Sequence, residues 1–290
     1  MNTREFFYNT NGRLRTGWRI MIFISLLLLA ILPLLLINNS YLQFTSALIL
    51  LYFGLYLNSK YLDKRDFNQY GLVFRKAFFK DLLVGILIGV FTVILILLFG
   101  DVSGILMISD SLKTPEASLV IAFAFKMLLV STLEETFFRG YLFTNLFDGF
   151  KSAHLSRTQS LSIAIIISSI IFGIAHFANN DSSIISMTLL AINGIVWCIP
   201  FVMTKNLGLS IGLHMAWNFT QTQLGFTMSG NQPVHSIYNI ENIGSKLMTG
   251  GEYGPEAGIL GLIGFILMLV ISLVYLKLVR NKTLYVNELN

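Results

Sequence analysis

The chain has little charge and only one cysteine. Charged residues make up 12% of its 290 residues, about half the fraction that is usual in a soluble domain. The single cysteine, Cys198, excludes an intramolecular disulfide, and in its apolar run we expect it to be a small packing residue. A soluble domain, a polar linker, a low-complexity tract and a convincing repeat are also missing. The low charge argues against a soluble protein.

What the sequence has instead is long apolar runs. Hydrophobic residues make up 54% of the chain, and each run is long enough to cross a bilayer core of about 30 Å. The runs are apolar all round, whereas the outer helices of a soluble core need a polar face. We therefore expect an all-α fold, a polytopic membrane helix bundle in which residues 1–290 form a single integral membrane domain. About eight spans are predicted, at residues 19–37, 41–57, 82–99, 117–147, 161–177, 184–203, 207–226 and 257–276.

Basic residues are distributed unevenly between the predicted connections. If the N-terminus is cytoplasmic, the outside connections hold only Lys113 and Lys246, and the inside connections hold nearly all the rest. Membrane proteins concentrate basic residues on the cytoplasmic side. We therefore expect a multi-pass protein of the plasma membrane with both termini in the cytoplasm. The net charge of +5 fits contact with anionic lipid, so the predicted partner is the lipid bilayer and not nucleic acid.

The first apolar run follows a basic stretch, as the apolar region of a signal peptide does. It is longer than such a region usually is, and no small-x-small cleavage site follows it. We therefore expect the first span to remain in the mature protein.

The third predicted span contains Gly85 and Gly89, a G-x-x-x-G pair. Such pairs let two membrane helices approach closely. The pattern is common in apolar runs, so alone it gives only a weak indication of a packing face.

Several polar residues lie inside the predicted spans, away from the span ends. Ionisable side chains are costly in a bilayer, so these residues should face the bundle interior, where partners or water compensate for the lost hydration. They lie in the fourth, fifth and seventh spans and are Lys126, Glu134, Glu135, Arg139, His176, His214 and Asn218.

The spacing of these residues indicates how they pair. Glu135 and Arg139 are four residues apart, in the favourable orientation for an ion pair on a helix. This pairing leaves Glu134 without a partner on its own helix, and adjacent residues point about 100° apart, so the two glutamates can have different roles. His214 and Asn218 have the same four-residue spacing and therefore share one helix face.

One free carboxylate, two histidines and a carboxamide are the parts of a hydrolytic centre. A carboxylate can take a proton from water, histidine can donate, accept or bind a metal, and asparagine can donate a hydrogen bond to an oxyanion. Any one of these residues alone is more often structural, holding helices together. For the whole group on three helices, we favour a functional centre.

Three short motifs follow one another in the fourth, fifth and seventh predicted spans. They are E-E-x-x-x-R at residues 134–139, F-x-x-x-H at residues 172–176 and H-x-x-x-N at residues 214–218. Each motif is weak alone, but the three in this order are a specific signal. The chain thereby resembles the CPBP family of intramembrane proteases, which includes CAAX prenyl proteases and bacteriocin-related (Abi) proteins. The resemblance covers about residues 117–227, the predicted CPBP/Abi catalytic core.

This resemblance implies peptide-bond hydrolysis inside the bilayer. In the family, the first glutamate activates the attacking water beside the first histidine, and these roles correspond to Glu134 and His176. The second histidine and the asparagine are implied at the oxyanion or at a metal, and the ion pair of the first motif supports the site. The predicted site residues are Glu134, Glu135, Arg139, His176, His214 and Asn218.

The sequence leaves open whether a metal takes part in catalysis. Catalytic zinc usually has three His or carboxylate ligands and a water, which Glu134, His176 and His214 could supply. However, no H-E-x-x-H motif is present, and glutamate-activated water works chemically without a metal. The sequence thus leaves two alternatives open: a divalent metal cofactor such as zinc, and a metal-independent mechanism.

Three functions are weighed on these grounds. The favoured one is an intramembrane endopeptidase that acts on a membrane-associated or hydrophobic peptide. The alternative is a non-catalytic immunity or regulatory scaffold protein, in which the polar pairs only assemble the bundle. A proton-coupled transporter is disfavoured because the sequence has no inverted repeat and no paired broken helices.

The predicted spans place the two histidines at different depths. Counted from the predicted cytoplasmic ends at 1.5 Å per residue, His214 lies about 12 Å deep and His176 about 22 Å. For the two to meet, the fifth helix must start earlier, tilt or sit higher than its predicted boundary.

Overall fold

The chain folds into a bundle of long helices. The computed structural model describes residues 3–9, 12–109, 113–151 and 154–282. The helices and strands are α1 (Thr3–Phe7), α2 (Thr16–Ile31), α3 (Ser40–Tyr61), α4 (Lys76–Val102), β1 (Leu106–Ile108), α5 (Ala117–Glu135), α6 (Thr144–Phe150), α7 (Arg157–Ile174), α8 (Ile184–Thr204), α9 (Gly208–Leu224), β2 (Ile240–Asn242), α10 (Lys246–Thr249) and α11 (Ile259–Leu278). A π-helix, Thr136–Phe143, joins α5 to α6, and short 3₁₀ segments cover Leu32–Leu36, Phe67–Tyr70, Gly251–Tyr253 and Pro255–Ala257.

Seven segments of the described chain are long and apolar enough to cross a membrane. They are Thr16–Leu36, Ser40–Tyr61, Lys76–Val102, Ala117–Phe150, Arg157–Ile174, Ile184–Thr204 and Ile259–Leu278. This confirms the predicted all-α polytopic bundle. The remaining predicted span is the helix α9, which has 17 residues and is too short to be counted with the seven. Most residues of α9 are buried by protein, so this helix can carry polar side chains that a lipid-facing helix could not.

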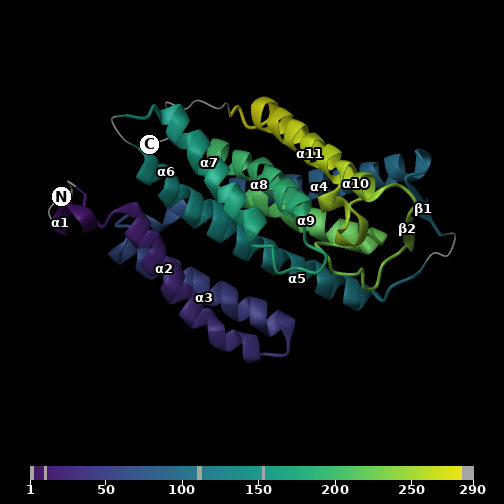
Figure 1. Cartoon of the computed structure of the whole chain (residues 1–290), viewed down its shortest axis with the longest axis horizontal. Coiled ribbons are helices and arrows are strands. Elements are labelled where there is room, and N and C mark those ends of the chain that lie inside the picture. Colours follow the sequence, from purple (N-terminus) through teal and green to yellow (C-terminus); the bar gives the residue numbers. More distant parts are fainter. Residues whose placement is uncertain (1–2, 10–11, 110–112, 152–153, 283–290) are drawn as a thin grey trace.

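The α2–α3 hairpin lies at the side of the bundle, and Figure 1 shows it leaning away from the other long helices. Its outer face is apolar and uncovered: Leu29 is 68% exposed and Leu36 is 85% exposed. An apolar surface of this kind marks contact with lipid in a membrane protein. At the other end of the hairpin, the buried Arg19 and Asp63 form an ion pair, with 2.9 Å between Nη1 and Oδ1. Asn145 of α6 donates to the second oxygen of Asp63 and so ties the hairpin to the bundle.

The glycine pair of α4 packs directly on α9. A Cβ at Gly85 would lie 2.5 Å from the carbonyl oxygen of Leu209, and one at Gly89 would lie 2.7 Å from the Cβ of Ala216. The approach is reciprocal, because a Cβ at Gly212 would lie 2.2 Å from the carbonyl oxygen of Leu82. The G-x-x-x-G pair is therefore a helix-packing face, and it holds α9, the helix of the third motif.

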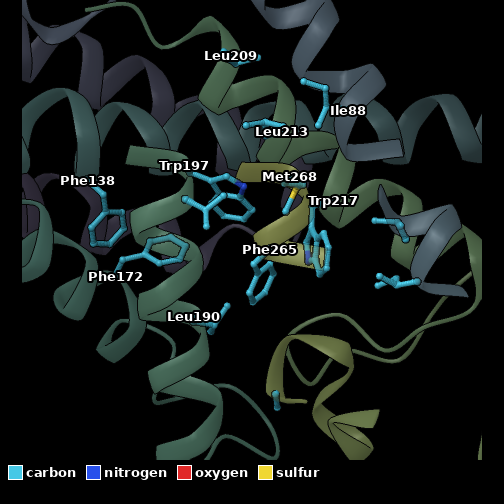
Figure 2. Close-up of a cluster of buried hydrophobic side chains, with 14 of the residues drawn as sticks. Ile88, Phe138, Phe172, Leu190, Trp197, Leu209, Leu213, Trp217, Phe265 and Met268 are labelled. Atoms are coloured by element: carbon cyan, nitrogen blue, oxygen red, sulfur yellow. The ribbon is translucent and has the colours of Figure 1, made fainter. Parts of the chain in front are cut away.

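Aromatic side chains fill the core beneath these helices. Figure 2 shows Phe138 and Phe172 next to each other, with Trp217 and Phe265 on the other side of Trp197. The rings of Phe138 and Phe172 meet edge to face, with 5.1 Å between centroids, which is a favourable arrangement for an aromatic pair. This aromatic pair thus connects the first motif to the second.

Two predicted loops contain a small sheet. β1 and β2 pair antiparallel, with Leu106 opposite Asn242 and Ile108 opposite Ile240. Figure 1 places this pair and α10 at one end of the molecule, and α1 and α6 at the opposite end. The sequence of these loops has no clear alternation of polar and apolar residues, which is why the pairing was not predicted.

Candidate active site

The first motif lies where α5 changes its helical geometry. Glu134 and Glu135 end α5, and Arg139 lies in the π-helix that follows. Such π-helical segments are rare and are frequent at functional sites. The side chain of Glu135 is fully buried, whereas that of Glu134 is 22% exposed and lines a cavity. The two glutamates therefore have different environments, as the predicted 100° separation requires.

Glu135 links the first motif to the third. Its Oε1 atom lies 2.9 Å from Nη1 of Arg139 and 2.8 Å from Nδ1 of His214. The first contact is the predicted i, i+4 ion pair. The second joins residues 79 positions apart, and the spacing of the sequence could not predict it. Glu135 thus holds both the arginine of its own helix and the histidine of α9.

The guanidinium group of Arg139 is enclosed by the bundle. It donates to the carbonyl oxygen of Gly194 at 3.2 Å, and its carbon atom lies 4.4 Å from the ring centroid of Phe172. Cation–π contacts of this kind gain strength when the partners are desolvated. Arg139 therefore connects α8 and α7 to the ion pair, which makes it a supporting residue and keeps it out of the cavity.

The free glutamate and the second histidine face each other across the cavity. Oε2 of Glu134 lies 3.9 Å from Nε2 of His214, too far for a hydrogen bond. This oxygen is buried and has no hydrogen-bond partner among the described residues. The ring of His214 stacks on Trp197 with 4.0 Å between centroids, which fixes its orientation. Glu134 is thus the carboxylate available for chemistry.

Hydrogen bonds assign the ring protons of both histidines. His176 lies just after α7, and its Nδ1 is 2.9 Å from the carbonyl oxygen of Phe172. His214 has Nδ1 at 2.8 Å from Oε1 of Glu135, the oxygen that also accepts from Arg139. Because carbonyl and carboxylate oxygens only accept, both Nδ1 atoms carry the proton, and in the neutral ring each Nε2 has a free lone pair. Asn218 then supplies an amide N–H group to the site.

These residues line one cavity of about 560 Å³. The cavity runs between α5, α7, α8 and α9 and reaches the loops that follow α7 and α9. Glu134, His176, His214 and Asn218 all lie in its wall, together with Lys126 of α5. The structure therefore brings the predicted carboxylate, histidines and carboxamide together, with Glu135 and Arg139 behind them.

The two histidines line the same cavity, so they lie closer in depth than the predicted helix starts implied. The helix α7 begins at Arg157, four residues before the predicted boundary of 161, and this earlier start alone would place His176 deeper and not shallower. In the first turn of α9, Ser210 donates to the carbonyl oxygen of Trp197 at 2.7 Å, and Trp197 lies well inside α8. Thus α9 begins within the bundle and not at its surface, which brings His214 toward the level of His176.

Glu256 is a buried carboxylate of the cavity wall that sequence reasoning placed in an outer loop. Its Oε1 accepts from Trp217 and Gln221 at 3.0 Å each, and its Oε2 accepts from the backbone N–H and the hydroxyl of Ser229 at 2.8 and 2.6 Å. Four donors leave no free acceptor toward the cavity. Burial raises the pKa of the neighbouring Tyr253 hydroxyl, which therefore stays neutral. Nothing in the sequence around Pro255 signals this burial.

The donor atoms near Glu134 suit a metal, but their arrangement does not gather a full ligand set. Histidine ligands of metals commonly donate their other ring N–H to a carboxylate or carbonyl oxygen, as His176 and His214 do. However, the described part of the chain contains no group of three His, Cys, Asp or Glu side chains placed to hold a metal ion. We therefore derive no chemical step through a metal.

Fold and site together define a class: a multi-pass helical membrane protein with a carboxylate and two histidines around a cavity in the bundle. The particular family follows from comparison. Residues 116–220 match the family model described as type II CAAX prenyl endopeptidase Rce1-like, a segment that includes all three motifs. The match confirms the predicted resemblance: over these residues the chain is similar to a CAAX-type endopeptidase family. No curated protein and no solved structure matches the chain.

Proposed function

We propose that the protein is an intramembrane endopeptidase that hydrolyses a peptide bond of a hydrophobic or membrane-associated peptide with water activated by Glu134. Residues 117–227 would form its catalytic core. The observation that carries this proposal is the environment of Glu134. Its Oε2 has no hydrogen-bond partner among the described residues, and it faces a cavity shared with both histidines and Asn218.

The proposed reaction uses these groups in sequence. Glu134 takes a proton from a water molecule, whose oxygen forms a bond to the carbonyl carbon of the substrate. The water has one further proton, and the Nε2 lone pair of either His176 or His214 can accept a hydrogen bond from it and so orient the water. Asn218 donates a hydrogen bond to the oxyanion. The carbon–nitrogen bond then breaks, and Glu134 returns its proton to the leaving amine.

The experiment that tests this proposal compares the termini of membrane peptides between cells with the wild-type protein and cells with Glu134→Ala. Both proteins are produced at matched levels. We expect peptide termini that depend on the wild-type protein and disappear in the variant, because the variant lacks the proton acceptor. Glu241→Ala is the matched control, since Glu241 is an exposed glutamate of β2 outside the cavity; it should leave the termini unchanged.

Two outcomes would contradict the proposal. If a true substrate is still cut by Glu134→Ala, the mechanism through this carboxylate is wrong. If peptide profiles are identical and the variant keeps the phenotype that deletion of the protein removes, the protein acts as a non-catalytic immunity or regulatory scaffold.

The metal is tested separately on the purified protein. Since the described residues do not gather three ligands, we expect cleavage of the identified substrate to survive dialysis against a strong chelator. Metal content is measured on the same sample before and after dialysis. Loss of cleavage that zinc restores would instead establish the predicted divalent cofactor with Glu134, His176 and His214 as its candidate ligands.

A further inference from the structure

A further cavity, of about 340 Å³, lies beside α6, which Figure 1 places at the end of the molecule opposite β1 and β2. We call it the α6 cavity. It shares no lining residue with the cavity around Glu134, although the π-helix contributes Phe138 to the first and Phe143 to the second. The proposed hydrolysis uses none of the residues that line the α6 cavity.

The charges that line the α6 cavity are mostly positive. Among its described lining residues, Arg65, Lys151 and Lys205 are basic, and Asp148 is the only acidic one. Asp148 is shared between several cations: its Oδ2 accepts from Nη2 of Arg65 at 2.5 Å, and its Oδ1 lies 3.5 Å from Nζ of Lys151. Arg13 also approaches it, with 3.9 Å between Nη1 and Oδ2. One carboxylate therefore faces three cations, and the cavity keeps a positive surplus.

Arg65 is the part of this charge that the protein holds in place. Its side chain is only 5% exposed, its Nε lies 3.5 Å from Oδ2 of Asp63, and its guanidinium carbon lies 5.7 Å from the ring centroid of Tyr70. Asp63 is itself paired with the buried Arg19 and does not line the cavity. A planar guanidinium held in this way is organised to bind an oxyanion, and the exposed Lys151 adds an ammonium group on a flexible stem.

The three basic residues lie at the ends of membrane-crossing segments. Lys151 directly follows the segment Ala117–Phe150, and Lys205 directly follows Ile184–Thr204. Arg65 lies in the connection that follows Ser40–Tyr61. All three belong to connections that the distribution of basic residues predicts to be cytoplasmic, and the cytoplasmic leaflet is the one that carries anionic lipid. The α6 cavity thus lies at the level where lipid headgroups are found.

Another part of the wall of the α6 cavity is aromatic. The rings of Phe143 and Phe147 stack with 3° between their planes, and Phe201 meets Phe143 edge to face with 5.9 Å between centroids. A volume of about 340 Å³ lies in the range of sites for small organic molecules, so the cavity has room for more than a phosphate group. Positive charge beside an apolar wall suits a molecule with an anionic head and an apolar body.

We propose that the α6 cavity binds an anionic phosphate group, with Arg65, Lys151 and Lys205 as its charged contacts. Arginine and lysine are common partners of phosphate oxygens, and basic pockets between membrane helices bind lipid headgroups. Two sources share this chemistry: the headgroup of an anionic phospholipid and a soluble phosphate ester. The aromatic wall and the position at the span ends favour the lipid. The proposal does not depend on the endopeptidase activity, because the two cavities have separate linings.

Native mass spectrometry of the full-length protein, released from detergent, tests the proposal by counting bound lipid molecules. The probes are phosphatidylglycerol and phosphatidylcholine with identical acyl chains, and glycerol 3-phosphate is added as a soluble competitor. One variant combines Lys151→Gln with Lys205→Gln, and a second carries arginine at both positions. The matched control combines Lys60→Gln with Lys76→Gln, which removes the same charge from two exposed lysines outside the cavity.

We expect the wild type to bind phosphatidylglycerol more tightly than phosphatidylcholine. The glutamine pair at 151 and 205 should weaken phosphatidylglycerol binding about 30-fold, since a basic residue near anionic lipid contributes about fivefold and two are lost. The arginine pair and the matched control should bind it like the wild type. Thermal unfolding of the glutamine pair should equal that of the control, because Lys151 and Lys205 are both exposed.

A second variant tests the cavity without changing its charge. Val73 is a half-buried residue of the lining, and Val73→Trp should fill the cavity and also weaken phosphatidylglycerol binding. If glycerol 3-phosphate displaces the lipid, the site takes soluble phosphate esters; if it does not, the lipid is the ligand. Equal binding of the two lipids by the wild type would overturn the proposal. Equal weakening in the glutamine pair and the matched control would also overturn it, because the lysines would then act only through general attraction to the membrane surface.

Discussion

At the scale of single residues, the site depends on one buried arginine. Arg139 neutralises Glu135, donates to the backbone of α8 and covers the ring of Phe172. Glu135 in turn holds Nδ1 of His214. The orientation of the histidine in the cavity therefore depends on a charge that never reaches the cavity.

Arg139→Ala should lower the stability of the protein by more than the loss of the Arg139 contacts alone would. The substitution leaves Glu135 buried without a positive partner, and breaking a buried pair in this way costs about 3–5 kcal/mol. Arg139→Lys should lose less stability, because it keeps the positive charge. It should still be less stable than the wild type, because lysine lacks the planar fork that reaches two acceptors. Thermal unfolding in detergent measures both. Arg75→Ala, at an exposed arginine, is the control and should unfold like the wild type; an equal effect at both positions would contradict this account.

The sequence could predict only those side-chain relations that lie within one helix. The pair Glu135–Arg139 is confirmed because four-residue spacing fixes it in any regular helix. Contacts between helices depend on depth and rotation, which periodicity does not contain. The bond from Glu135 to His214 and the burial of Glu256 were missed for that reason.

At the scale of elements, the fit of α9 against α4 determines where the third motif lies. The helix starts inside the bundle and has polar residues on a surface that protein covers almost completely. Close approach at Gly85 and Gly212 permits this burial. The sequence indicated a packing face at Gly85 and Gly89, but not its partner, because every neighbouring span is similarly apolar. The π-helix after Glu135 also has no sequence signal that distinguishes it from an α-helix.

Gly212→Leu should displace α9 and with it His214. Its Cβ alone would lie 2.2 Å from the carbonyl oxygen of Leu82, and overpacking of this kind costs about 1–3 kcal/mol or more. We expect lower thermal stability in detergent and loss of substrate cleavage. Gly17→Leu is the matched control, since a Cβ at Gly17 in α2 meets no atom within 4 Å. Wild-type cleavage by Gly212→Leu would show that the α4–α9 contact does not position the histidine.

At the scale of the whole molecule, the two ends of the bundle have different roles. The cavity is lined by loop residues that follow α7 and α9, such as Asn179 and Gln232. The ion-paired Arg19 and Asp63 tie the α2–α3 hairpin to α6 at the other end, where Figure 1 places α1. If basic residues mark the cytoplasmic side, the cavity reaches toward the outer side of the membrane, and its peptide would be presented from there.

This orientation is tested by labelling single cysteines in intact cells with a membrane-impermeant maleimide. The starting protein is Cys198→Ala, which removes the buried native thiol. Cysteine is then introduced at the exposed Gln232 beside the cavity, or at the exposed Lys64 between α3 and α4. Gln232→Cys should be labelled in intact cells, and Lys64→Cys only after the membrane is permeabilised, because 58–80 is a predicted cytoplasmic segment. The reverse pattern would place the termini outside and the cavity mouth toward the cytoplasm, so that a cytoplasmic peptide would become the expected substrate.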